Sequence, residues 1–203
     1  MAWLGNGLSS AKLHTDALSV REAQFSMMKR LGAPEHYLLV TQSNLASTYR
    51  TVGRYEESMR LRRDAYSGCA RLYGEEHAET LIEANNLANL LEHLERFEEV
   101  KSLLRRSMPV ARRVLGASHD HTLRMRCIYA QSLYWDTGAA LADLREAVTT
   151  LEEIERTARR VLGGAHPKAA AMERSLQAAR EALRAREAGE TLIFVNARDV
   201  RKT

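Results

Sequence analysis

The feature that most constrains the fold of this chain is an internal repeat of 42 residues. Three kinds of landmark share this spacing: a glycine, an Asn-Leu-Ala motif and an Arg-aromatic-Glu-Glu motif. They stand at Gly32, Gly74 and Gly116, at 44–46 and 86–88, and at 54–57 and 96–99. A fixed period of this length is typical of solenoids, in which each repeat buries its apolar face against its neighbours. Solenoids present extended surfaces, so the repeat favours binding of another macromolecule.

The composition favours helices in every repeat. Of the 203 residues, 45% are hydrophobic, 28% are charged and only three are proline. From His77 to Leu94, apolar residues recur at spacings of three and four, which predicts an amphipathic helix. A second helix is expected from Phe97 to Leu115, with a kink or local break at Pro109. Gly116 would end it, because glycine readily adopts the left-handed cap conformation.

We therefore predict an all-α fold, a right-handed α-solenoid of stacked antiparallel helix pairs in a single array over residues 1–189. The array divides into a truncated repeat at 1–32, repeats at 33–74, 75–116 and 117–163, and a C-terminal capping helix at 166–189. In the repeat at 33–74, the helices are expected near His36–Val52 and Arg54–Tyr73.

Two segments depart from the regular period. Gly116 and Gly163 are 47 positions apart, and we expect the surplus of five residues in a loop at Asp136–Asp143. Such a loop either docks a partner or has drifted in a tolerated position. The irregular tail at 190–203 carries the apolar run 192–195. A strand-like extension, a docking motif and an ill-fitting terminal sequence all remain open for this tail.

The charge pattern indicates a solvated helical surface. The formal net charge is +4 and the two signs are interleaved, which favours acidic partners. Arginine pairs on the second helices fit a solvated face; they stand at 62–63, 105–106, 112–113 and 159–160. Binding of nucleic acid or another anionic surface is the alternative function, although a concentrated basic stripe is more usual there.

The sequence also bears on location. Two distant cysteines, no recognisable secretory leader and no apolar run near 20 residues favour a soluble, cytoplasmic protein that does not enter a membrane.

No motif points to catalysis, so we expect no enzyme activity, no cofactor and no small-molecule substrate. His119-Asp120-His121 could suggest a metal site. However, His119 is in phase with His77 at the start of a helix, which favours a structural role at the turn. Cys69 and Cys127 are interpreted as buried or inert thiols rather than nucleophiles.

The repeats resemble the tetratricopeptide repeats of kinesin light chains. The resemblance lies in the order Leu87-Ala88, Leu91, Phe97 and Val100, and in the Asn-Asn-Leu-Ala motif at 85–88. It lies also in a Leu-Gly pair followed by histidine, at 115–119 and 162–166, and it extends over roughly 4–183. The resemblance implies a non-enzymatic adaptor whose first helices line a concave groove that holds an extended peptide or a partner helix.

The resemblance also implies which residues line that groove. Carried onto this sequence, they are Ser43, Asn44, Ser47, Arg50, Asn85, Asn86, Asn89, Glu92, Arg124, Cys127, Gln131 and Tyr134. The asparagine amides both donate and accept, so they suit a peptide backbone. Arg50 and Arg124 would hold carboxylates of an acidic partner.

Overall fold

The computed structural model describes residues 13–189, which form eight α-helices and no strand. The helices are α2 (His14–Arg30), α3 (Glu35–Thr51), α4 (Tyr55–Tyr73), α5 (Ala78–His93), α6 (Phe97–Val114), α7 (Asp120–Tyr134), α8 (Leu141–Leu162) and α9 (Pro167–Glu187). The predicted all-α fold is confirmed. The tail at 190–203 and the beginning of the truncated repeat lie outside the described residues.

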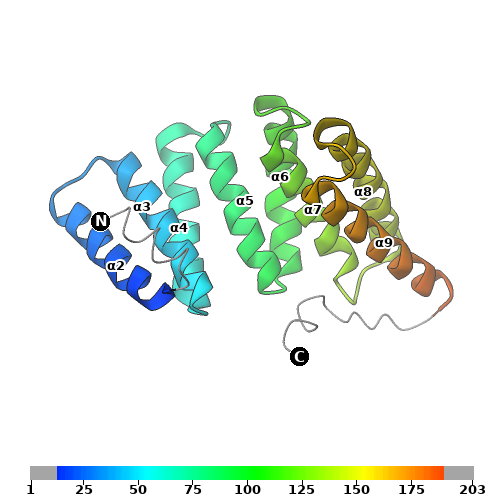
Figure 1. Ribbon diagram of the computed structural model, residues 1–203, viewed down its shortest axis with the longest axis horizontal. Helices are drawn as coiled ribbons and strands as arrows, with labels where there is room; N and C mark the ends of the chain where they lie inside the picture. The colour runs from blue at the N-terminus through cyan, green and yellow to red at the C-terminus, as the bar shows by residue number, and fades with distance from the viewer. Residues whose placement is uncertain (1–12, 190–203) are drawn as a thin grey trace. The chain divides into compact units, whose positions relative to one another are not determined.

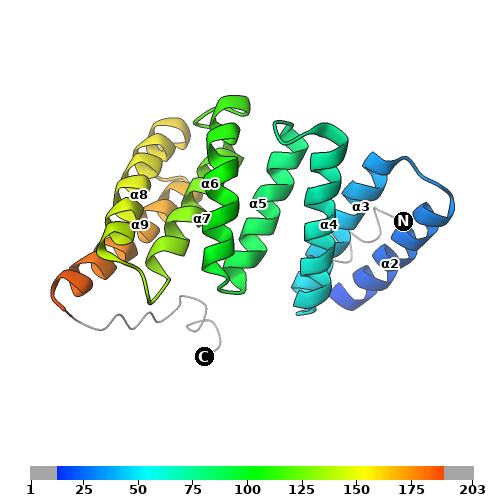
Figure 2. The same cartoon turned by 180° about the vertical axis from the view of Figure 1, so that it is seen from behind.

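The helices fall into two compact units, with the division between Leu91 and Glu92 near the end of α5. In the first unit, α3 packs against both α2 and α4 (Figure 1). In the second unit, α7 packs against α6 and α8, while α9 packs against α8 and also contacts α7 (Figure 2). Within each unit most of these contacts join helices that are neighbours in the sequence, and the α7–α9 contact joins next-but-one helices, as in stacked helix pairs.

The apolar core of the first unit shows why the repeat motif is kept. Leu45, Ala46 and Tyr49 of α3 form a buried cluster with Leu61 of α4. Ala46 has no exposed surface, and its carbonyl oxygen accepts a 2.7 Å hydrogen bond from Ser58 Oγ on α4. A larger side chain at this position would force the two helices apart. The corresponding alanines of the next two repeats, Ala88 and Ala130, are also fully buried.

The repeated histidine is a helix cap, as its phase predicts. The Nδ1 atoms of His77, His119 and His166 each accept a hydrogen bond from the backbone amide two residues later. The N···N distances are 3.2, 3.3 and 3.1 Å, respectively. Each bond satisfies a backbone donor that the first turn of a helix leaves without a partner. The predicted glycine cap is present as well, because Gly116 follows α6 with a φ of 100°.

Two local expectations are corrected in part. Of the kink or local break expected at Pro109, the break is absent, because α6 runs through this residue as one helix. The third repeat does not place its whole surplus in a loop, since α8 has 22 residues where α6 has 18. Four residues make about one helical turn. Asp143 therefore lies in the first turn of α8, where its carboxylate accepts a 3.1 Å hydrogen bond from the Ala140 amide.

A search of residues 13–189 finds no helix with the length and hydropathy that crossing a membrane requires.

Candidate functional site

A buried ion pair joins two helices of the first unit. Nη1 of Arg62, on α4, lies 3.2 Å from Oε2 of Glu83, on α5, and the two side chains are 8% and 9% exposed. Burial lowers the pKa of the Arg62 guanidinium, and the Glu83 carboxylate acts in the opposite direction. The guanidinium stays charged because its ordinary pKa lies far above neutral pH. The pair therefore places two charges inside the protein, where they hold α4 to α5.

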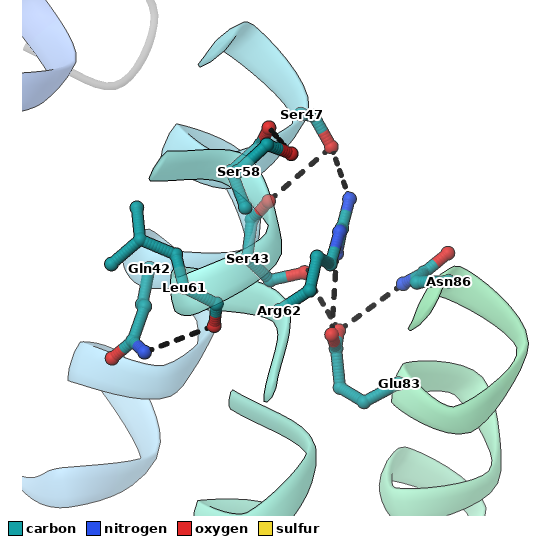
Figure 3. A network of polar contacts seen from close by, with 9 residues as sticks. Gln42, Ser43, Ser47, Ser58, Leu61, Arg62, Glu83 and Asn86 are labelled. Atoms are coloured by element: carbon teal, nitrogen blue, oxygen red, sulfur yellow. Dashed lines mark hydrogen bonds and ion pairs between the residues drawn. The ribbon is translucent and has the colours of Figure 1, made fainter. Parts of the chain in front are cut away.

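Two serines of α3 complete this network. Arg62 donates from Nη1 to Ser43 Oγ and from Nη2 to Ser47 Oγ, both at 2.5 Å. The Ser43 hydroxyl also forms a 2.7 Å hydrogen bond with Oε1 of Glu83. Figure 3 shows the Arg62 side chain between these serines and the carboxylate. Hydrogen bonds to charged groups are stronger than neutral ones, so three helices are fixed through one guanidinium.

Polar side chains reach the surface around this network. Asn86 Nδ2 donates to Glu83 Oε1 at 3.2 Å, and Arg50 Nη1 donates to Asn89 Oδ1 at 3.3 Å. Asn86 and Asn89 are half-buried, whereas Arg50 is exposed. We refer to Ser43, Ser47, Arg50, Asn86 and Asn89 together as the α3/α5 polar face. Asn44 is exposed on the same helix as the serines.

In the second unit, the predicted groove residues lie on α7. Arg124 is exposed, and Cys127 and Gln131 are half-buried. Gln131 Nε2 donates to Ser175 Oγ of α9 at 3.1 Å, so the capping helix engages this residue. Burial raises the pKa of the Cys127 thiol to about 12, with Glu92 adding to the shift.

Three predicted groove residues are buried, and we withdraw them from the candidate surface. Asn85, Glu92 and Tyr134 are 1%, 4% and 2% exposed. The physical reason is helical geometry: neighbouring residues are separated by about 100° around the axis, so Asn85 turns inward where Asn86 reaches the surface. Burial also raises the pKa of the Tyr134 hydroxyl, which agrees with its position in the interior.

The two residues that hold the polar face together, Arg62 and Glu83, are not among the groove residues expected from the sequence. The arginine pair 62–63 suggests a solvated face, yet Arg62 is 7% exposed and only Arg63 is open to solvent. The repeat register carries a signal for this burial. Arg62 and Glu83 stand 42 positions before Leu104 and Met125, both of which have no exposed surface.

Metal-ligating side chains and the Cys69 thiol were compared with what a metal site or a nucleophile requires. Within the described part of the chain, no three His, Cys, Asp or Glu side chains are grouped so that they could hold a metal ion. Burial raises the pKa of Cys69 to about 11, and Glu83 and Glu79 add to this shift. A thiol with a raised pKa is mostly protonated at neutral pH and is a poor nucleophile.

Comparison with known proteins agrees with this architecture. The tetratricopeptide-repeat family matches the sequence at residues 38–79 and 84–121. These two stretches therefore match tetratricopeptide repeats, which generally serve as protein-interaction modules. Among curated proteins, none matches the sequence significantly.

Several solved structures share this fold. One is a Podosopora anserina protein of kinesin-light-chain type with nearly identical TPR-like repeats, at a TM-score of 0.75. A variant of that protein reaches 0.77, and both are 21% identical over 91% of this chain and 85% of theirs. BtubC (BKLC) from P. vanneervenii has a TM-score of 0.60 and 19% identity over 95% of this chain and 81% of its own. The fold is thus that of kinesin-light-chain-like repeat proteins, as the sequence predicts.

Proposed function

We propose that the α3/α5 polar face binds an extended peptide segment of a partner protein, and that the chain acts as a non-catalytic adaptor. The observation that carries this proposal is the buried Arg62–Glu83 pair, which holds the serines of α3 and Asn86 of α5 in fixed positions. Side chains that are already ordered lose less entropy when a ligand binds. A rigid polar surface of this kind suits an incoming peptide backbone.

The chemistry of the face fits a peptide with an acidic residue. Asparagine amides offer both donors and acceptors, so Asn86 and Asn89 can pair with backbone groups whatever the peptide side chains are. The exposed Arg50 guanidinium presents a fork of donors that matches a carboxylate. Its 3.3 Å hydrogen bond to Asn89 places this charge beside the amides.

The test is a pull-down from cell extract with the wild type and an Asn89→Ala/Arg50→Glu double variant, followed by mass spectrometry. Arg60→Glu, on the exposed side of α4, supplies a matched charge reversal outside the face. We expect a set of proteins that the wild type and Arg60→Glu capture and the double variant loses, while circular dichroism shows equal helicity in all three.

An identical capture profile for all three proteins would contradict the proposal. If that profile also vanished at high salt, the exposed arginines of the second helices would be the binding surface. Steep salt dependence is the mark of binding to an anionic polymer or surface.

A further inference from the structure

We propose that a recess in the first unit accepts the cationic side chain of a lysine or arginine in the bound peptide. The recess has a volume of about 230 Å³ and lies between the beginning of α3, the end of α4 and the beginning of α5. Its walls include His36, Val40, Cys69, Tyr73, Glu79 and Glu83. The proposal rests on the proposed function, because Glu83 belongs both to this recess and to the ion pair under the α3/α5 polar face.

The aromatic wall of the recess is held in place before any ligand arrives. The Tyr73 ring stacks on the His77 ring with centroids 4.5 Å apart and planes 19° from parallel. His77 is itself fixed, because its Nδ1 accepts the Glu79 backbone amide at 3.2 Å. The Thr80 hydroxyl donates to the Gly74 carbonyl at 2.7 Å and ties the same corner together. Tyr73 nevertheless stays 37% exposed and lines the recess.

The charges around the recess favour a cation. Glu83 is paired with Arg62, and Glu35, close by on α3, is paired with Arg71. Within residues 13–189, no cation lies within ion-pair distance of the Glu79 carboxylate, which is exposed. A positive side chain entering the recess would therefore meet a carboxylate that no protein cation already neutralises.

The raised pKa values of the Cys69 thiol and the Tyr73 hydroxyl agree with a negative potential in the recess. Burial raises the pKa of the Cys69 thiol to about 11, and the Glu83 and Glu79 carboxylates add to the shift. Burial also raises the pKa of the Tyr73 hydroxyl, with further contributions from Cys69, Glu79 and Glu35. Negative charges resist the formation of a further anion and attract a cation instead.

The combination of walls selects one kind of side chain. Val40 is 55% exposed and offers an apolar surface for the methylene stem of lysine or arginine. The face of Tyr73 attracts the charged head through its ring quadrupole, and Glu79 pairs with that head. Pockets that enclose small molecules usually measure about 300–1,000 Å³, so this recess suits a single side chain. An acidic side chain would meet Glu79 as a like charge.

The test begins with a displayed library of random linear peptides, selected on the wild-type protein and sequenced. We expect lysine or arginine to be enriched at one position of the selected peptides. A selected peptide is then synthesised with lysine and with N-acetyl-lysine at that position, which keeps the stem and removes the charge. Its affinity for the wild type should fall by about fivefold to thirtyfold on acetylation.

Two variants locate the effect in the recess. Glu79→Gln and Tyr73→Ala, both at exposed positions, should reduce the difference between the lysine and acetyl-lysine peptides. Glu56→Gln, in the first turn of α4 and so at the opposite end of that helix from Tyr73, is the matched control and should leave the difference unchanged. Circular dichroism checks that each variant keeps its helices.

The outcomes separate this proposal from the proposed function. Selected peptides without a basic residue, but sensitive to Asn89→Ala/Arg50→Glu, would overturn the cation recess and leave the polar face as the binding site. Equal sensitivity to acetylation in the wild type and in Glu79→Gln would also overturn it. Failure of the wild type to select any peptide would contradict both proposals.

Discussion

Replacing Arg62 with leucine should destabilise the first unit by about 3–5 kcal/mol, because it leaves a buried carboxylate without its counter-charge. The side chain of Glu83 is only 9% exposed, and its Oε2 lies 3.2 Å from the guanidinium. The Ser43 and Asn86 side chains would still contact Oε1, but neither supplies a positive charge. Glu83→Met should lower the free energy of unfolding by a similar amount, since it leaves the buried Arg62 guanidinium without its carboxylate.

The double variant Arg62→Leu/Glu83→Met should behave quite differently. It gives this repeat the residue types that the next repeat carries at Leu104 and Met125, both fully buried. Exchanging a buried ion pair for apolar residues of similar size is often neutral or stabilising by about 1–4 kcal/mol. The double variant should therefore be close to the wild type in stability, or above it, while each single variant lies well below.

Urea unfolding followed by circular dichroism measures these free energies for the wild type, both single variants and the double variant. Arg63→Leu, at the exposed neighbouring position, is the control and should stay within about 0.5 kcal/mol of the wild type. Single variants that also stayed within that range would show that the buried charges do not depend on each other. The same conclusion would follow if the loss of unfolding free energy in the double variant equalled the sum of the losses in the two single variants, because the two charges would then act independently.

Three further predictions test the register, the capping helix and the cysteines. Leu87→Asp should abolish the cooperative helical melt seen by circular dichroism, because Leu87 is 6% exposed and would become an unpaired buried charge; a native-like melt would show that the repeat register is wrong. The hydrogen bond from the Lys168 ammonium lowers the pKa of Asp120, so the unfolded chain binds this proton more readily and the pair stabilises the fold at neutral pH. That contribution disappears as the pH falls through the lowered pKa of Asp120, and Asp120→Asn should therefore make the urea midpoint less sensitive to acid; an unchanged acid dependence would contradict this. Burial raises the thiol pKa of Cys69 from 9.0 to about 11 and that of Cys127 to about 12, so both should react with a disulfide reagent at least about a hundredfold more slowly in the folded protein than in urea. Equal labelling rates in the two states would count against that burial.

The repeat period makes the helices predictable because it fixes where each element begins and ends. Helix α3 was expected near His36–Val52 and spans Glu35–Thr51, and α5 was expected from His77 to Leu94 and spans Ala78–His93. The same phase identified the role of His119, whose ring accepts the His121 amide. Capping residues and glycines act on the adjacent backbone, so their positions in the sequence are enough to predict where most helices begin and end.

Burial of individual polar residues was harder to predict, because residue type and repeat position disagree. Arg62 and Glu83 are charged, which suggests a solvated face, but they occupy positions that are apolar in the next repeat. Each becomes acceptable in the interior only because the other is there, and a pairing between separate helices is not visible in either helix alone. Asn85 was expected at the groove surface because of the family resemblance, but it is only 1% exposed.

Binding of an extended peptide to the α3/α5 polar face can be seen in solution by nuclear magnetic resonance. Backbone amide chemical shifts of isotope-labelled protein are mapped as a display-selected peptide is added. We predict that the largest changes fall on α3 and α5, around Ser43, Ser47 and Asn89. Changes confined to the arginine-bearing faces of α6 and α8, with the amide shifts of α3 and α5 unchanged, would contradict peptide binding at the polar face.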